Sequence, residues 1–254
     1  MARANTYLAP LSLLFLAGSL AMLFFVILSA VTTTSPLQET YFLSANTDGI
    51  TGARSVTQWA YFYICGENNQ DCSKATPAPP LGWAWSGNPE NAPSELIGEH
   101  GGDTTSEYFF YMWRFGWVFY LIALVFSILA FFSGFVACCG RLGSAIAGLM
   151  ALVALFFHTI AVSLMTAVFV RMRNIFIANG REASLGRYAF GFSWGSWTAL
   201  LIATILFCIG IRGSKEGTYG SGSGSGGRRW GRQRSVRSRR SYDMNGRRVK
   251  EDYA

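Results

Sequence analysis

Two closely spaced cysteines, Cys65 and Cys72, are the residues in this sequence best suited to covalent chemistry. A disulfide between them would close a small turn and fix its local shape, although closing a short loop stabilises less than closing a long one. Such a bond persists only in an oxidising compartment. Two free thiols are the alternative, and an oxidising compartment disfavours them. The pair therefore predicts a disulfide rather than a reactive site.

The two histidines give no sign of catalysis. His100 lies in a Gly-rich stretch and His158 lies inside a long apolar block. No zinc-ligand spacing, phosphate-binding loop or nucleophile elbow accompanies them, so we expect no catalytic residue, no metal and no cofactor, and we predict that the protein is not an enzyme. Because an ionisable residue within a membrane span often marks function, His158 has two interpretations: a functional group, or a neutral imidazole hydrogen-bonded to a neighbouring helix.

An arginine-rich run near the carboxyl end is the third feature with chemical potential. A Gly/Ser-rich stretch over residues 217–227 precedes it and is typical of a flexible linker. The run contains Arg228, Arg229, Arg232, Arg234, Arg237, Arg239 and Arg240. Since each basic residue near an anionic membrane surface contributes about 1 kcal/mol, the run predicts binding to anionic inner-leaflet lipids.

Three serines, Ser235, Ser238 and Ser241, lie among these arginines as possible phosphorylation sites. Each phosphate would add a charge of about −1.5 to −2 and weaken binding to an anionic membrane. RNA binding is the rival explanation of an Arg/Ser run, but a membrane tether makes lipid the nearer polyanion, and we expect no nucleic-acid partner. A solvated tail that only sets the topology remains as the third alternative.

Four apolar blocks must position these residues. Only 14% of the residues are charged and 51% are hydrophobic, whereas soluble domains carry about 25% charged residues. The blocks span residues 8–31, 113–139, 142–170 and 189–211. Each is long enough to cross a membrane as a helix, which pairs all its own backbone groups. The sequence predicts an all-α membrane protein: a four-transmembrane-helix bundle with a disulfide-stapled, partly β extracellular loop.

The lengths of the first and third blocks carry further predictions. The first is longer than the apolar region of a signal peptide, so we predict an uncleaved anchor. The third is long enough for its helix to continue beyond the membrane, up to residue 178, where it would support the outer loop.

Charge decides the predicted topology. The first connection, residues 32–112, is strongly acidic, whereas the last segment, residues 212–254, is strongly basic. Because basic residues near the spans are retained in the cytoplasm, residues 1–7 and 212–254 are predicted to be cytoplasmic, and residues 32–112 and 171–188 extracellular. Four arginines in the second outer connection oppose this assignment: Arg171, Arg173, Arg181 and Arg187.

Local sequence patterns predict finer features of the loops and of the ends of the spans. Residues 58–64 and 41–43 are rich in aromatics and predict short strands. Residues 108–117 contain seven aromatic residues, as in the aromatic belt at a membrane interface. Cys138 and Cys139 end the second span on its cytoplasmic side, where they are either palmitoylation sites or small packed residues.

Together these features resemble the fungal Sur-seven/PalI family of four-span proteins, which is distantly claudin-like in pattern. The residues that carry the resemblance are Pro36, Tyr41–Leu43, Asn46–Ile50, Trp59 and the pair Cys65 and Cys72, and the similarity covers roughly residues 8–212. Claudins usually carry Gly-Leu-Trp before the first cysteine, which is absent here, so a paracellular-barrier role is not implied. PalI-type members have much longer tails, which favours the Sur-seven side.

The resemblance implies a non-enzymatic organiser of plasma-membrane cortical patches of the eisosome type, linked with membrane organisation, cell-wall integrity and endocytosis. We expect it to act by homo-oligomerisation or by association with other plasma-membrane proteins. The alternative function is that of a sensor or trafficking chaperone for another plasma-membrane protein, with the bundle as its docking face.

Overall fold

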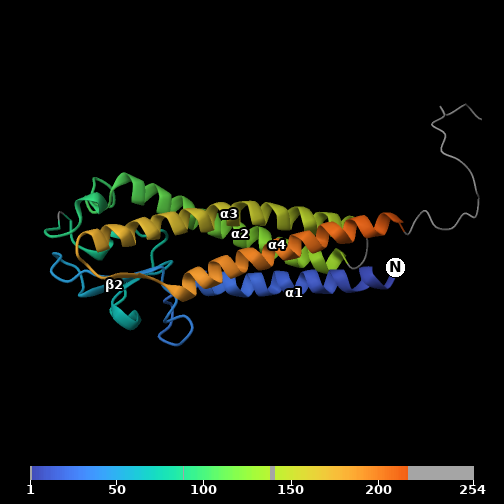
Figure 1. Cartoon of the computed structure of the whole chain (residues 1–254), viewed down its shortest axis with the longest axis horizontal. Helices are drawn as coiled ribbons and strands as arrows, with labels where there is room; N and C mark the ends of the chain where they lie inside the picture. The colour runs from blue at the N-terminus through green and yellow to red at the C-terminus, as the bar shows by residue number, and fades with distance from the viewer. Residues whose placement is uncertain (1, 88, 138–140, 217–254) are drawn as a thin grey trace, which may run out of the picture. The chain divides into compact units, whose positions relative to one another are not determined.

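Four long helices dominate the computed structural model, which describes residues 2–87, 89–137 and 141–216 (Figure 1). They are α1 (Ala2–Ile27), α2 (Glu107–Ala137), α3 (Arg141–Ala178) and α4 (Arg187–Glu216). Each contains an apolar stretch that is long enough to cross a membrane, by length and composition. The predicted four-helix fold class is therefore confirmed.

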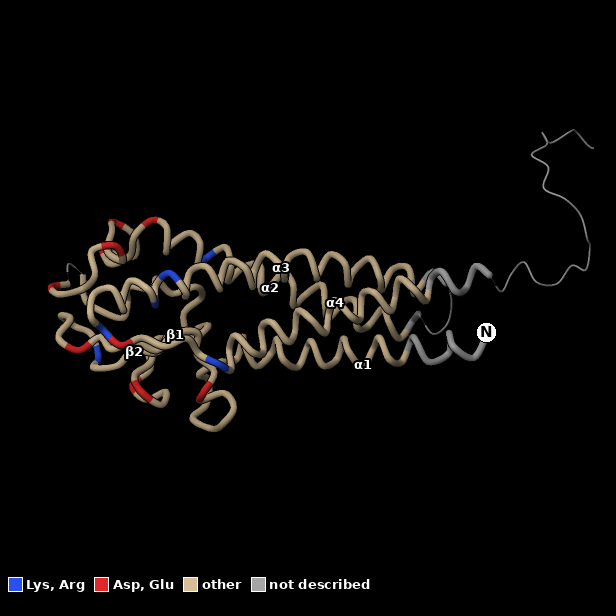
Figure 2. The backbone as a smooth tube through the Cα atoms, in the orientation of Figure 1, with Lys and Arg blue, Asp and Glu red and all other residues tan. Residues whose placement is uncertain are grey.

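The helices pack in two pairs, α1 along α4 and α2 along α3, and α3 also contacts α4 (Figure 1). Among the residues that Figure 2 describes, the acidic and basic ones gather at one end of the bundle. The sequence explains this segregation, because no charged residue occurs between Arg3 and Glu39, between Arg114 and Arg141, or between Arg187 and Arg212. We call residues 28–106 and 179–186, at the charged end, the cap, and the four helices the bundle.

Two helices continue into the cap. At about 1.5 Å per residue, the 38 residues of α3 extend roughly 57 Å, well beyond the ~30 Å of a hydrocarbon core. The helix ends just before Gly180, whose φ of 72° lies in the left-handed region that glycine adopts without strain. Beyond it, the N–H of Arg181 donates to the carbonyl of Phe176 at 3.0 Å and closes the end of the helix. The outer ends of α2 and α3 therefore form one wall of the cap.

A four-stranded antiparallel sheet joins the two outer connections. Its strands are β1 (Leu43–Asn46), β2 (Val56–Trp59), β3 (Ile64–Cys65) and β4 (Ala183–Leu185), in the order β3-β2-β1-β4. The strands of the first connection agree with the predicted partly β loop. The single strand predicted over residues 58–64 is instead divided into β2 and β3 by residues 60–63. No sequence pattern predicts β4, which pairs with β1 across a long separation in the chain.

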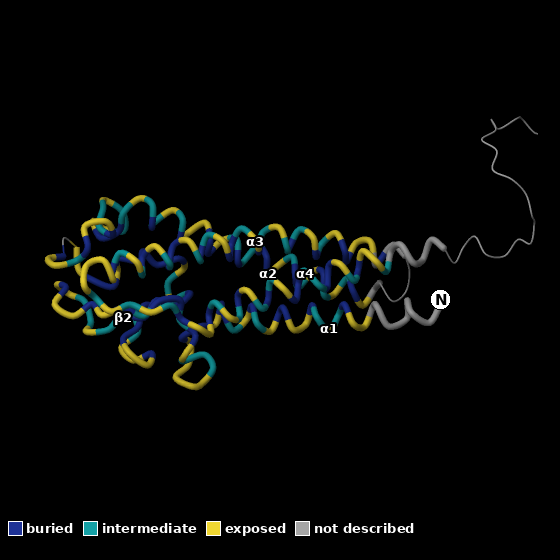
Figure 3. Tube along the Cα trace, viewed as in Figure 1, coloured by how far each residue is buried: buried dark blue, intermediate teal, exposed yellow. Residues whose placement is uncertain are grey.

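Buried residues occur both along the helices and in the cap (Figure 3). They form two large clusters of different composition. The outer cluster lies where the cap meets the bundle and is rich in aromatics, including Phe42, Trp59, Tyr61, Trp113 and Phe169. The inner cluster lies within the bundle and consists mainly of alanines, joined by Leu16, Leu200 and Phe207. Cap and bundle thus share the outer core, so each supports the other.

Candidate functional site

The predicted disulfide is present and fixes a turn over the exit of α1. Cys65 is fully buried, and it packs with Cys72 against Ala30 and Ala60. Within the closed turn, the N–H of Gly66 bonds the carbonyl of Gln70 at 2.8 Å. The bond therefore shapes the cap and presents no reactive thiol.

Two polar contacts hold this turn to its surroundings. The Nδ2 of Asn69 donates to the carbonyl of Thr32 at 3.3 Å, just beyond α1. The Nε of Arg54 pairs with the Asp71 carboxylate at 2.8 Å, which ties the turn to the β1–β2 connection. The stapled turn is thus fastened to two other segments of the cap.

Trp59, the tryptophan of the family resemblance, is a core residue. Its side chain is only 1% exposed, and its indole Nε1 donates to the carbonyl of Leu81 at 2.9 Å. Its ring lies 5.9 Å from that of Phe176 on α3, measured between centroids. Trp59 therefore joins the sheet, the proline-rich part of the cap and the projecting end of α3.

A reciprocal pair of hydrogen bonds joins the cap to α2. The Tyr61 hydroxyl donates to the carbonyl of Trp117 at 2.6 Å, and the Trp117 indole donates to the carbonyl of Tyr61 at 3.1 Å. Burial raises the pKa of the Tyr61 phenol far above its usual value, with a smaller contribution from nearby Tyr120. Tyr61 consequently stays protonated and keeps its donor role throughout the physiological pH range.

Arg181 is the functional residue that sequence reasoning missed. Its Nη1 donates to the carbonyls of Asp48 at 2.7 Å and Asn46 at 3.5 Å, and its Nη2 donates to the carbonyl of Asn91 at 3.0 Å. One guanidinium therefore holds three stretches of cap backbone. In the sequence the outer arginines count only against the predicted topology, but Arg181 has a structural role. No local sequence signal indicates it, because its acceptors lie about 90 to 135 residues earlier in the chain.

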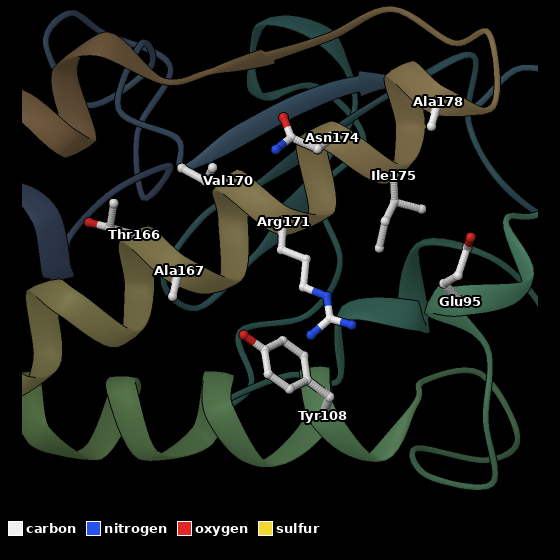
Figure 4. A pocket seen from close by; sticks show the side chains of 9 residues that line it. All are labelled: Glu95, Tyr108, Thr166, Ala167, Val170, Arg171, Asn174, Ile175 and Ala178. Atoms are coloured by element: carbon white, nitrogen blue, oxygen red, sulfur yellow. The ribbon is translucent and has the colours of Figure 1, made fainter.

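An open groove lies between the outer ends of α2 and α3 and holds about 560 Å³ (Figure 4). The guanidinium of Arg171 extends from α3 to 4.2 Å from the ring centroid of Tyr108 on α2. Glu95 lies at the edge of the groove, but the only ion pair among the described residues joins Arg54 and Asp71. The groove therefore presents an accessible cation above an apolar wall that includes Ala167 and Val170.

The two histidines occupy unlike places. The His100 ring makes a tilted contact with Phe110 and an edge-on contact with Tyr111, near the start of α2. His158 is completely buried within the bundle, with its ring 5.6 Å from Tyr120, and neither ring nitrogen has a hydrogen-bond partner among the described residues. The expected hydrogen bond to a neighbouring helix is thus not seen in that part of the chain. No group of three or more His, Cys, Asp or Glu side chains is arranged to hold a metal there.

The remaining predicted sites lie outside the described residues. These are the candidate palmitoylation sites Cys138 and Cys139, the arginines of residues 228–240, and the serines Ser235, Ser238 and Ser241. Cys208, which lies in α4, is a free and exposed thiol.

Comparison with known proteins gives a consistent result. The sequence matches the SUR7/PalI family over residues 8–206. It is 34% identical over 198 residues to the SUR7 family protein FMP45 of Saccharomyces cerevisiae. The aligned region covers 76% of this chain but only 62% of FMP45. It is 31% identical over 201 residues to the protein SUR7 of Candida albicans, with 78% of this chain and 72% of that protein covered.

A further relative adds a location. The chain is 28% identical over 216 residues to a plasma membrane protein of Saccharomyces cerevisiae, YNL194C, with 82% of this chain and 70% of that protein covered. The resemblance inferred from the motif around Trp59, Cys65 and Cys72 is confirmed by these matches.

Proposed function

Because this chain belongs to the SUR7/PalI family, we propose that it is a non-enzymatic plasma-membrane protein that organises cortical patches of the eisosome type. In this role it would support membrane organisation, cell-wall integrity and endocytosis. The plasma-membrane location is supported by the name of its relative YNL194C. The chain spans only 62% of FMP45, so these activities are proposed for this chain and not transferred from that relative.

The observation that carries the proposal is the shared aromatic core between cap and bundle. Residues from α1, α2, α3, the sheet and the first outer connection all contribute to it. A cap that is fused to its membrane helices in this way stays in a fixed orientation relative to the bilayer. Such a rigid element can set the spacing of neighbours, which is what the organiser of a patch must do.

The bundle offers apolar surface for lateral contacts. Large side chains are exposed along α2 and α3, among them Val125, Phe132, Leu149 and Phe156. In a bilayer these side chains meet lipid or another helix, and helix association there depends on close packing rather than on the hydrophobic effect. We propose that this surface supports homo-oligomerisation or association with other plasma-membrane proteins.

Native mass spectrometry of the full chain, extracted in a mild detergent, tests this proposal. A discrete homo-oligomer is the expected result. A stoichiometric foreign subunit would favour the alternative of a sensor or trafficking chaperone, for which the Arg171 groove offers an anionic partner a docking place. A monomer without partners would contradict both functions.

We further propose that both termini are cytoplasmic and that the cap is extracellular. The disulfide supports this orientation, because such bonds persist outside the reducing cytosol, and the acidic cap agrees with the retention of basic segments inside. Protease added to intact cells should leave the carboxyl-terminal arginines uncut. Removal of that end under these conditions would overturn the orientation.

In the same orientation we propose that the arginine run binds anionic inner-leaflet lipids and that phosphorylation of Ser235, Ser238 and Ser241 weakens this binding. Liposomes with anionic lipid should bind the full chain less well when the seven arginines are replaced by glutamine. Equal binding would remove lipid recognition from the tail. Palmitoylation at Cys138 and Cys139 is a related proposal, and loss of a hydroxylamine-sensitive acyl group in the Cys→Ser variants would test it.

A further inference from the structure

A second cavity, of about 440 Å³, lies against the sheet. Side chains alternate between the two faces of a strand. Leu43 and Trp59 are buried in the outer core, so Ser44 and Gln58 belong to the opposite face, where both line this cavity. The connection before β1, the stapled turn and the start of α4 form its walls. We call it the sheet cleft.

A row of polar side chains forms the floor of the sheet cleft. Ser44 on the central strand β1 is paired with Gln58 on β2 and with Ser184 on β4. Cross-strand partners on one face lie about 5 Å apart, so two hydroxyls and an amide follow one another across the sheet. This spacing suits a ligand that carries several hydrogen-bonding groups on one edge.

Gln58 carries a buried hydrogen-bond acceptor that lacks a donor. Its side chain is only 7% exposed, and its Oε1 has no hydrogen-bond partner among the described residues. A buried acceptor without a donor is costly, and native proteins rarely retain one without a reason. Gln58 lines the sheet cleft, so a turn of its amide would bring the enclosed Oε1 to a donor group bound there and complete its hydrogen bonding.

The rim of the cleft combines opposite charges with aromatic rings. Glu39 and Glu67 supply acceptors, Arg187 supplies donors, and Tyr41 and Tyr188 supply ring surfaces. The two carboxylates disfavour an anionic ligand. The described residues provide no cluster of three acidic, His or Cys ligands for a metal. A neutral ligand that both donates and accepts hydrogen bonds matches this lining best.

Sugars have this chemistry. Each hydroxyl group both donates and accepts hydrogen bonds, and the C–H face of the ring, which is slightly positive, packs against the negative face of an aromatic ring. The cavity also falls within the usual size range of small-molecule sites. We propose that the sheet cleft binds a neutral sugar ring and that the Gln58 Oε1 accepts a hydrogen bond from one of its hydroxyls.

The sugar can come from either of two sources, a soluble or matrix glycan or the headgroup of a glycolipid. Two experimental arms separate them. In the first, the full chain in lipid nanodiscs is titrated with neutral di- and trisaccharides of glucose, mannose and N-acetylglucosamine, and binding is measured by saturation-transfer NMR and calorimetry. In the second, nanodiscs contain a neutral glycosylceramide or the matching ceramide, and retained lipid is counted by native mass spectrometry. Sugar-headed detergents are excluded from purification because they would compete.

The variant Gln58→Met tests the key contact, since methionine has a similar shape but offers no amide. We expect about a tenfold loss of affinity in whichever arm shows binding, as for one lost hydrogen bond. The same variant should unfold at an equal or higher temperature without sugar, because it removes an unpaired buried acceptor. Gln70→Met, at an exposed glutamine that does not line the cleft, is the matched control and should leave affinity unchanged.

A second variant guards against misfolding. Glu39 is exposed, so Glu39→Gln should fold normally and weaken sugar binding a few-fold. Sugar binding in either arm that falls in both cleft variants but not in Gln70→Met supports the proposal. Absence of sugar binding in both arms, or binding that the cleft variants leave unchanged, overturns it. Neither outcome depends on whether the protein organises patches.

Discussion

The cap and the bundle are built on opposite principles. The outer core uses large aromatic rings, and two of its indoles donate to backbone carbonyls: Trp59 to Leu81 and Trp113 to Pro79 at 2.8 Å. The inner core uses small alanines that let helices approach closely. In the cap, water drives the burial of these rings. Between lipid-facing helices that force is absent, and packing of small residues replaces it.

The two cores should therefore respond differently to substitution. Truncating a buried side chain of the outer core should lower the free energy of unfolding by the full cost of a cavity. Removing a polar contact from the bundle should lower it only a little. Substitutions in the cap and in the bundle, each with its control, test this expected difference in stability.

The largest effect is expected from Trp59→Ala. Removal of this buried ring leaves a cavity in the outer core, which costs about 3–5 kcal/mol for a tryptophan. Denaturant titration of the full chain in detergent should show early loss of the cap, with helical circular dichroism largely retained. Trp83→Ala is the control, because Trp83 is 49% exposed and should change stability by far less. Equal losses for the two variants would contradict the special role of the outer core.

Much of this division could be predicted from the sequence. The charge-free blocks predict the four helices, because a continuous apolar segment in a hydrocarbon core pairs its own backbone groups by forming a helix. The pair Cys65 and Cys72 predicts the disulfide. The short strand β4 could not be predicted, since three residues carry no periodicity and its pairing with β1 depends on long-range contacts. Neither could the role of Arg181 or the sheet cleft, because both arise only when distant segments meet.

The next largest effect is expected from opening the staple. Replacing both Cys65 and Cys72 with alanine should lower the free energy of unfolding of the cap by about 2–3 kcal/mol, since a short loop then regains its freedom. Differential scanning calorimetry with and without a reductant measures this loss. The control is Cys208→Ala, at the exposed free cysteine of α4, which should have little effect with or without reductant. A bundle that melts together with the opened cap at the same lowered temperature would show that the two regions are one cooperative unit.

A smaller loss is expected from Arg181→Met. The variant keeps the aliphatic stem but removes the donors that hold the carbonyls of Asp48, Asn46 and Asn91. Because the site is partly exposed, we expect a loss of about 1–2 kcal/mol. Amide hydrogen exchange should speed up in the segments around Asn46 and Asn91. Arg173→Met, near the end of α3, is the control and should not alter hydrogen exchange around Asn46 and Asn91. Equal exchange in the two variants would show that the Arg181 hydrogen bonds do not hold these segments.

The smallest effect is expected in the bundle, at a pair of hydroxyl groups that joins α1 to α4. Ser19 and Ser196 each donate to the other's backbone carbonyl, at 2.8 and 2.9 Å. Polar contacts between membrane helices contribute on average about 0.6 kcal/mol, so a double-mutant cycle of Ser19→Ala and Ser196→Ala should give a coupling energy near that value. Thr198→Ala, whose hydroxyl bonds only within α4, is the control. If small residues alone hold a helix pair together, the pair should tolerate the loss of one hydroxyl. A coupling energy as large as the loss of stability from Trp59→Ala would therefore mean that the bundle, like the cap, depends on specific contacts.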